Sequence, residues 1–246
     1  MSKENPRTAI VTGSSRGIGA AVAQRLADDG FAVVVNYTGS AAEAEALVGK
    51  IKQSGGRALS IQADVSDPQA MRRMFDQAVA LTGAVDVVVN NAGIMLLSTI
   101  AEADDATFDR QIAVNLKGVF NGMREAAQRV RSGGRIISFS SSVVGLYPAT
   151  YALYAATKAA VETMTHILSK ELRGRNVTVN AVAPGPVATQ LFLKGKSPAA
   201  VEQLAKQAPL ERLGDASDIA RVVSFLAGPD GAWINGQVLR ANGGII

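Results

Sequence analysis

The sequence predicts an α/β fold with a doubly wound, mostly parallel sheet of seven strands. The first observation is that short runs rich in valine and isoleucine alternate along the 246 residues with longer helical patterns. The second is that these runs are continuously apolar, as is typical of strands buried on both faces. The third is the regular strand–helix order, which favours right-handed crossovers between parallel strands.

The elements follow one another along the chain in a regular order. Strands are predicted at 8–13, 32–37, 59–64, 85–91, 135–141, 177–184 and 237–244. Helices are predicted at 17–29, 41–54, 67–82, 104–130, 151–173 and 215–227. The sequence contains no repeat, low-complexity segment or linker that would divide it, so residues 1–246 are expected to form one domain.

The segment 189–214 departs from this pattern, because it mixes charge, glycine, proline and a short helical stretch. It follows the sixth strand, at the carboxyl edge where open α/β sheets bind their ligands. We interpret it as a small lid over a substrate site. The alternative is that the segment is an ordinary surface loop.

Composition limits the chemistry. The sequence has no cysteine and one histidine, His166, which excludes disulfides and thiolate catalysis and leaves no expected metal site. The net charge of +4 without a basic run gives no indication of nucleic-acid binding. The N-terminus "MSKENPRTAIV" lacks an apolar signal core, and no run is long enough to span a membrane. We therefore expect a cytoplasmic protein without a membrane partner.

The stretch "TAIVTGSSRGIGAAVAQRLADDG" reads as strand, glycine-rich turn and helix. Gly13, Gly17 and Gly19 permit close backbone approach, and the helix that opens there directs its N–H groups toward an anion. After the first strand of a doubly wound sheet, this arrangement is typical of dinucleotide binding in Rossmann-type folds. A tight turn without a ligand is the alternative.

The end of the second strand indicates which dinucleotide binds. An NAD enzyme usually carries an acidic residue there, but this chain reads "VVVNYTGS", with Asn36, Tyr37 and Ser40. Arg16 in the glycine loop is placed to reach the same ribose, and arginine and hydroxyl groups suit a 2′-phosphate. The sequence thus predicts NADP(H) over NAD(H), unless Arg16 merely faces solvent.

The alanine-rich stretch "YALYAATKAAVETM" predicts a helix. Tyr154 and Lys158 are four residues apart and share a face, and a nearby ammonium would lower the pKa of the phenol. Tyr154 is then a candidate acid–base group. Packing, with a snorkelling lysine, is the alternative. Tyr151 has no lysine four residues later and is interpreted as packing or as pocket wall.

Several motifs together resemble the short-chain dehydrogenase/reductase family over essentially the whole chain. "TGSSRGIG" is similar to the family's cofactor loop, "NNAG" to its central-strand motif and "YAATK" to its Tyr–Lys pair. "AVNLKGVF", "SFSSSVVG" and "NAVAPGPVAT" match its asparagine, serine and proline–glycine motifs in the family order.

The resemblance implies a reversible hydride transfer between NADP(H) and a carbonyl or secondary alcohol. Tyr154 would exchange the proton, a serine would hold the substrate oxygen, Lys158 would bind the nicotinamide ribose, and Asn115 would hold a water near the lysine. The implied cofactor contacts are Gly13, Ser15, Arg16, Gly17, Ile18, Gly19, Asn36, Tyr37, Ser40, Asp64, Val65, Asn91, Ala92, Gly93, Tyr154, Lys158, Pro184, Gly185, Val187 and Thr189.

The sequence leaves the active serine open between two neighbours. The family spacing of thirteen residues before the tyrosine selects Ser141, whereas the pattern S-x-x-G ending at Gly145 selects Ser142. Strand neighbours alternate faces, so these serines cannot all point into one site. Ser141 is the prediction.

The substrate is the least determined feature. Within the family the motifs look most like 3-oxoacyl-[acyl-carrier-protein] reductases, and Arg129, Arg131, Arg173 and Arg175 would form the patch for an acidic carrier protein or a CoA thioester. The alternative is that these arginines lie at the C-terminal ends of helices only because a positive charge interacts favourably with the helix dipole there. Reductases of other ketones, sugars, steroids or quinones share these features. A non-catalytic dinucleotide sensor and an extended-type epimerase or dehydratase fit less well. The resemblance also implies a homotetramer, although the sequence alone does not separate a tetramer from a dimer.

Overall fold

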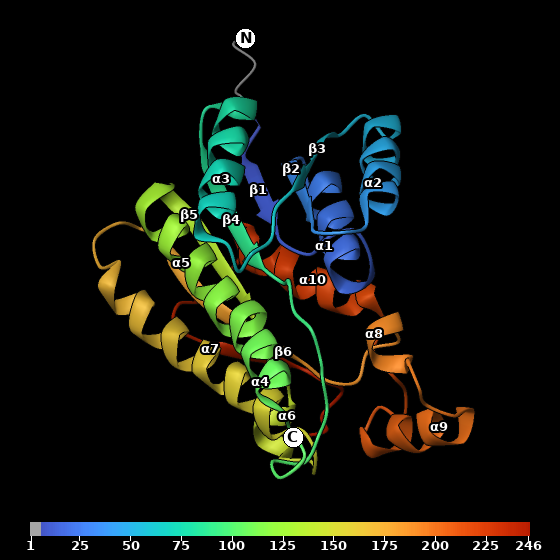
Figure 1. Ribbon diagram of the computed structural model, residues 1–246. Helices are drawn as coiled ribbons and strands as arrows, with labels where there is room; N and C mark the ends of the chain where they lie inside the picture. Colours follow the sequence, from blue (N-terminus) through green and yellow to red (C-terminus); the bar gives the residue numbers. More distant parts are fainter. Residues whose placement is uncertain (1–5) are drawn as a thin grey trace.

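A parallel sheet of seven strands forms the centre of the molecule. The computed structural model describes residues 6–246, so the predicted absence of a signal peptide falls partly on residues outside the described range. The strands lie in the order β3-β2-β1-β4-β5-β6-β7, and every neighbouring pair is parallel (Figure 1). Their bounds are β1 Thr8–Val11, β2 Ala32–Tyr37, β3 Arg57–Gln62, β4 Val85–Asn90, β5 Val130–Phe139, β6 Thr178–Pro184 and β7 Val238–Ala241. The predicted fold class is confirmed.

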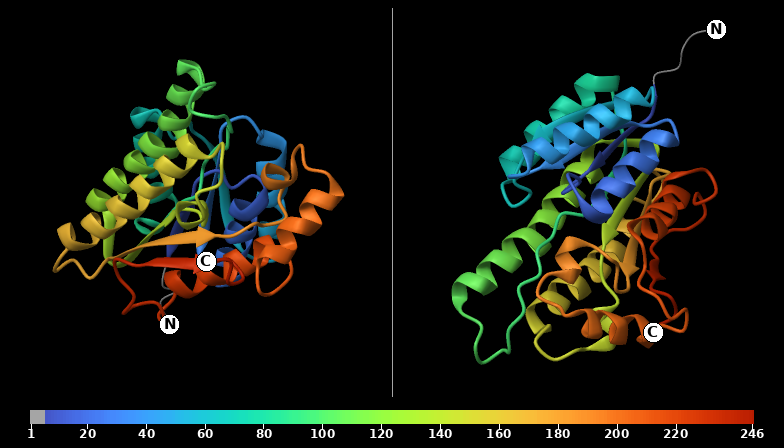
Figure 2. Two further views of the ribbon diagram at one scale, coloured as in Figure 1. Left: turned by 90° about the horizontal axis from the view of Figure 1, so that it is seen from below. Right: turned by 90° about the vertical axis from the view of Figure 1, so that its right-hand side faces the viewer.

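Helices cover both faces of this sheet, as the two core clusters show. Alternate residues of one strand enter different clusters: Ala9 and Val11 face one, and Ile10 faces the other. The first face is covered by α1 (Gly17–Asp28), α2 (Ala41–Gln53) and α10 (Ala216–Ala227). The second is covered by α3 (Pro68–Thr82), α5 (Gly118–Arg129) and α7 (Ala152–Glu171), as Figure 2 shows. This double burial explains the continuously apolar strands.

The predicted helix 104–130 is interrupted. It consists of α4 (Asp105–Gln111), a π-helical segment η1 (Ile112–Lys117) and α5. Pattern reasoning missed the interruption, because a wider turn barely changes hydrophobic periodicity. Short π segments often occur at functional sites, and this one contains Asn115.

The segment 189–214 leaves the sheet after β6 and carries two short helices, α8 (Gln190–Leu193) and α9 (Pro198–Gln207). The two ends of this segment lie side by side, because Val187 and Gly214 pair as a parallel bridge and the Ala188 N–H donates to the Gly214 carbonyl at 2.9 Å. A small helix, α6 (Val143–Leu146), follows β5 on the facing side. Figure 2 shows α8 and α9 standing apart from the layers that cover the sheet.

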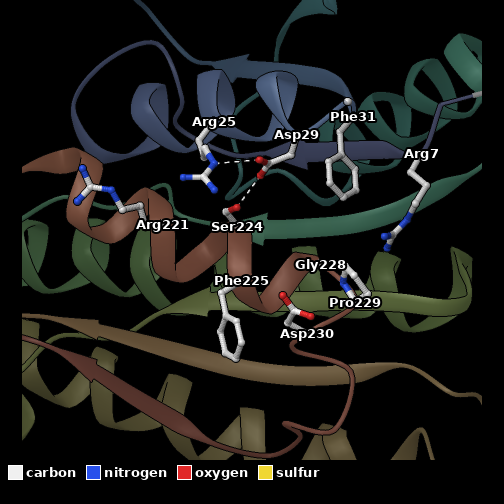
Figure 3. A pocket seen from close by; sticks show the side chains of 11 residues that line it. Arg7, Arg25, Asp29, Phe31, Arg221, Ser224, Phe225, Gly228, Pro229 and Asp230 are labelled. Atoms are coloured by element: carbon white, nitrogen blue, oxygen red, sulfur yellow. Dashed lines mark hydrogen bonds and ion pairs between the residues drawn. The ribbon is translucent and has the colours of Figure 1, made fainter.

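A hollow of about 470 Å³ lies at the amino edge of the sheet, between the C-terminal ends of α1 and α10 (Figure 3). Asp29 accepts a hydrogen bond from Arg25 at 2.9 Å and another from Ser224 at 2.6 Å, so the charges of Arg25 and Asp29 are paired within the chain. Residues just before the first residues of the strands line this hollow, so it lies away from the carboxyl edge.

In the described part of the chain, no helix is long and apolar enough to cross a membrane.

Candidate active site

The glycine loop lies in the crevice where the strand order reverses between β1 and β4. Gly13 and Gly17 have positive φ angles of 62° and 59°. A Cβ on Gly13 would lie 2.8 Å from the Ala92 Cα, and the Asn91 amide donates to the Gly13 carbonyl at 3.0 Å. The loop and the end of β4 are therefore in contact, and α1 opens directly toward the crevice.

The groups at the end of β2 divide into buried and accessible ones. Asn36 is buried: its side-chain oxygen accepts from the Gly13 N–H at 3.1 Å, and its Nδ2 donates to the Ala63 carbonyl at 3.0 Å. Its amide thus fastens the glycine loop to β3 and is not free for a ribose. Tyr37 and Ser40 are half-buried, and Arg16 is exposed at the start of α1.

Asp64 and Val65 follow β3 beside the crevice. Asp64 accepts two hydrogen bonds from Ser66, at 2.9 Å from its N–H and 2.7 Å from its hydroxyl, and lies 3.9 Å from Arg110. Burial raises the pKa of Asp64, but the hydrogen bonds and Arg110 outweigh that effect, so the pKa is lowered. Val65 is buried and packs against Gly118.

Tyr154 and Lys158 lie on the first two turns of α7 and line one cavity of about 410 Å³. Ser141, at the end of β5, lines the same cavity and is hydrogen-bonded to the Tyr154 hydroxyl. The Tyr151 ring stands edge-on to that of Tyr154, with 6.3 Å between the ring centroids. The spacing of four residues on α7 thus places a phenol, a hydroxyl and an ammonium around one space.

The expected electrostatic effect of Lys158 on Tyr154 is not found. Lys158 Nζ donates to the Phe139 carbonyl at 2.9 Å and lies 5.6 Å from the centroid of the Tyr154 ring. Burial raises the pKa of Tyr154 to about 12, although the hydrogen bond from Ser141 lowers it. Burial also lowers the pKa of Lys158 to about 8. The prediction that Lys158 lowers the phenol's pKa is therefore wrong for this structure, because desolvation dominates.

The three consecutive serines have different partners. Ser140 donates to Glu162 at 2.6 Å. Ser142 is buried, donates to the Ala183 carbonyl at 3.3 Å and accepts from Asn242 at 3.1 Å. All three serines line the cavity, but the hydrogen bond to Tyr154 comes from Ser141, whereas the hydroxyls of Ser140 and Ser142 are bonded to other groups. This geometry agrees with the choice of Ser141, which stays a prediction.

Asn115 lies behind the cavity wall. Its Oδ1 accepts from the Ile94 N–H at 2.8 Å, and its Nδ2 donates to the Ile94 carbonyl at 2.8 Å. A Cβ on Gly93 would lie 3.4 Å from Asn115 Oδ1 and 3.7 Å from Lys158 Nζ. Asn115 thus holds the backbone that separates it from Lys158, and its own side chain is fully buried.

The opposite wall is formed by the segment after β6 and by the lid. This wall includes the four residues that the family resemblance assigns to the nicotinamide side, which are Pro184, Gly185, Val187 and Thr189. Thr189 also caps α8, and its Cγ2 would lie 3.7 Å from a Cβ on Gly17. Sequence reasoning did not name several further apolar lining residues, among them Met95, Val143, Leu204 and Ile245. Their only signal was apolar character near a motif or within the lid.

The four arginines of the predicted carrier-protein patch do not all end helices. Arg129 is the last residue of α5, Arg131 lies in β5, and Arg173 and Arg175 follow the C-terminal end of α7. They lie at the edge of the sheet opposite Tyr154. Arg129 pairs with Asp76 at 2.5 Å. Arg131 pairs with Asp86, and Arg175 donates to the Val130 carbonyl at 2.7 Å. Three of these guanidinium groups are therefore engaged within the chain.

Comparisons with known proteins agree with this geometry. A family model described as Enoyl-(Acyl carrier protein) reductase matches residues 13–246. An NADPH-dependent aldehyde reductase-like protein, chloroplastic, from Arabidopsis thaliana is 46% identical and covers 98% of this chain and 94% of the relative. A short-chain type dehydrogenase/reductase from Picea abies is 47% identical over 97% of this chain and 92% of the relative.

A solved structure is similar throughout. A short chain dehydrogenase from Burkholderia cenocepacia J2315, in complex with NADP, has a TM-score of 0.92 at 38% identity and covers 99% of both chains. The chain belongs to the short-chain dehydrogenase/reductase family. Members of this family are NAD(P)-dependent oxidoreductases, and the resemblance deduced from the motifs is confirmed.

Proposed function

We propose that this protein reduces an aldehyde or ketone to the alcohol with NADPH, in a reversible hydride transfer. The observation that carries the proposal is the convergence of Tyr154, Ser141 and Lys158 on one cavity whose facing wall is the segment after β6. The Arabidopsis relative is named for NADPH-dependent aldehyde reduction, which supports the same chemistry.

The crevice fits a dinucleotide. The missing side chains of Gly13 and Gly19 let the loop lie against the end of β4, and the opened N-terminus of α1 suits a pyrophosphate. Gly13, Ser15, Gly17, Ile18 and Gly19 would hold the phosphates, with Asp64, Val65, Asn91, Ala92 and Gly93 around the adenosine. Pro184, Gly185, Val187 and Thr189 would hold the nicotinamide, which supplies the hydride when bound.

Each catalytic group then has a definite task. Tyr154 is a neutral phenol at neutral pH, because its pKa is about 12, and it donates its proton to the carbonyl oxygen during reduction. The Ser141 hydroxyl donates a hydrogen bond to the same oxygen and stabilises the charge that develops on it. Lys158 binds the nicotinamide ribose and passes a proton toward Tyr154. Asn115 fixes the wall beside Lys158, and the water that the family resemblance implies there stays a prediction.

The two candidate serines are separable by mutation. Ser141→Ala is expected to lower kcat by about 10²-fold, because it removes a donor to the substrate oxygen. Ser142→Ala is expected to leave kcat close to wild type and to lower the free energy of unfolding by about 1–3 kcal/mol, because it removes the hydroxyl that donates to the Ala183 carbonyl and accepts from the Asn242 amide. Steady-state kinetics and thermal unfolding of both variants measure this. A larger kcat loss in Ser142→Ala would reverse the assignment.

Cofactor choice is the next prediction. Tyr37→Asp is expected to lower the preference for NADPH over NADH by tenfold or more, roughly the effect of one lost charge-assisted contact. A carboxylate at the end of β2 would repel the 2′-phosphate and accept from a ribose 2′-OH. The ratio of kcat/KM for the two cofactors measures it. An unchanged ratio would mean that the phosphate is recognised elsewhere, away from Tyr37, Ser40 and Arg16.

A 3-oxoacyl thioester on an acyl carrier protein or CoA is the second candidate substrate. The description of the matching family model names an acyl carrier protein, although with an enoyl and not a 3-oxoacyl group, whereas the internal pairing of Arg129, Arg131 and Arg175 favours a small free carbonyl compound. NADPH oxidation is measured with benzaldehyde and with acetoacetyl-CoA, and NADH serves as the control. Turnover of benzaldehyde supports our proposal, turnover of acetoacetyl-CoA alone moves the substrate to thioesters, and no turnover of either contradicts reduction of these two classes.

Self-association belongs to the same proposal. Apolar side chains are exposed on the helices of one face, including Phe120 on α5 and Ile167 on α7, and β7 is an edge strand. A homotetramer, as the family resemblance implies, would cover these surfaces, and light scattering after size exclusion measures its mass. The cytoplasmic location expected from the sequence stays a prediction.

A further inference from the structure

The lid and the last residues of the chain together form the outer wall of the cavity. Leu191 and Phe192 on α8, Leu204 on α9 and Ile245 all line it. Ile245 is brought there by a turn at Gly243 and Gly244, whose φ angles are 68° and 87°. A side chain at either position would be strained at these φ angles, and it would be tightly packed, since a Cβ on Gly243 would lie 3.2 Å from the Ala208 Cβ and one on Gly244 would lie 3.2 Å from the Pro209 ring.

The inner wall has the same apolar character. Met95, Val143, Leu146 and Pro148 line it beside Tyr151. The end of the chain packs against α6, since a Cβ on Gly145 would lie 2.6 Å from the Ile246 Cδ1. The space in front of Tyr154 is thus enclosed by aliphatic and aromatic side chains from separate segments of the chain.

Charge is almost absent from this enclosure. Among the described residues that line the cavity, Lys158 alone carries a charged side chain. Lys158 is buried, and its ammonium donates to the Phe139 carbonyl. An anionic group on the substrate would therefore enter the cavity with no accessible cation to pair with, and burying an unpaired charge is strongly unfavourable.

We propose that the substrate is an uncharged aromatic or branched aliphatic carbonyl compound, and that Leu204 helps to select it against anionic carbonyl compounds. The inference rests on the proposed reductase function and names its substrate class. Apolar side chains on both walls gain from burying a ring or branched chain next to the reacting carbonyl. The hydroxyls of Ser141 and Tyr154 remain the polar groups that orient the carbonyl oxygen.

Two aldehydes of nearly the same shape test the inference. Methyl 4-formylbenzoate and 4-carboxybenzaldehyde carry para groups of similar size, but only the second is charged at neutral pH. Wild-type kcat/KM, measured by NADPH oxidation at pH 7, is expected to be about 100-fold or more higher for the ester. Equal kcat/KM values for the two aldehydes would overturn the inference and leave the reductase function intact.

A charge added to the lid gives a second arm with a matched control. Leu204→Lys places an ammonium on the cavity wall. It is expected to lower the ratio of kcat/KM for the ester to kcat/KM for the carboxylate about tenfold, because the carboxylate gains a partner. Gln203→Lys adds the same charge at the exposed neighbouring position of α9, which does not line the cavity, and is expected to leave the ratio unchanged. Equal ratios in the two variants would contradict the role of Leu204.

The outcomes also separate this inference from the proposed function. NADPH binding is followed by fluorescence in each variant, so a lost cofactor site is distinguished from a changed substrate site. If neither aldehyde is reduced by wild type while NADPH still binds, both the substrate class and the aldehyde reductase function are rejected. If only the carboxylate is reduced, the function stands and the substrate class is reversed.

Discussion

Tyr154→Phe is expected to lower kcat for carbonyl reduction by about 10²–10⁴-fold, the usual contribution of a positioned general acid. The variant removes the hydroxyl that is hydrogen-bonded to Ser141 and keeps the ring that lines the cavity. Binding of NADPH, measured by fluorescence titration, is expected to change little, because the phosphate loop lies on other elements. Single-turnover kinetics then locate the loss in the chemical step.

The control for this variant is Tyr151→Phe, which removes the same hydroxyl from the neighbouring ring, 6.3 Å away between centroids. Tyr151 has no lysine one turn later, and its pKa is raised by burial alone. A far smaller loss of kcat is expected. Activity close to wild type in Tyr154→Phe would reject the proposed mechanism, and an equal loss in both variants would indicate a packing effect.

The pH dependence of the wild type follows from Lys158. Its pKa is lowered from 10.5 to about 8 by burial, so the ammonium is present below about pH 8 and is lost as the pH rises through that value. If Lys158 passes the proton to Tyr154, the rate of reduction should fall over the same range. Reduction that stays constant to pH 10 would exclude this relay.

The fold was predictable because its signals are local and repeated. The apolar runs of the inner strands β1, β4 and β6 are buried on both sides, and glycine or a polar residue marks most element ends. The predicted strand bounds were wrong where pairing with a neighbouring strand overrides the local sequence preference. β5 begins at Val130 instead of 135, because Val130 pairs with Val85 ahead of a register shift in the ladder. The sequence "RSGG" between them gave no strand signal.

The candidate site was predictable where residues belong to motifs with fixed spacing. Tyr154, Lys158 and Ser141 meet as expected, because helix and strand periodicity fix their directions. Asn36 illustrates the limit: a polar residue at the end of a strand suggested a ribose contact, but its amide is used by backbone groups 23 to 27 residues away. Ile245 illustrates another limit of the sequence, since its place in the cavity depends on a turn that packs against the lid.

Gly19→Ala is expected to weaken NADPH binding tenfold or more and to destabilise the fold by about 1–3 kcal/mol. A Cβ at this position would lie 2.5 Å from the Asn91 Nδ2, 2.5 Å from the Gly13 carbonyl oxygen and 2.9 Å from the Ser14 Cα. Two of these atoms belong to the backbone of the phosphate loop, so the loop itself has to move. The contact between the loop and the end of β4 would then open.

Gly49→Ala is the matched control, because it makes the same change in the middle of α2, where nothing lies within 4 Å of the added Cβ. Alanine is the better helix former by about 1 kcal/mol, so this variant should unfold at a higher temperature and bind NADPH as wild type does. Fluorescence titration and thermal unfolding of the two variants compare a crowded glycine with an open one. Wild-type NADPH affinity in Gly19→Ala would show that the phosphate loop tolerates the shift, and the cofactor would then have to be held mainly by groups outside it.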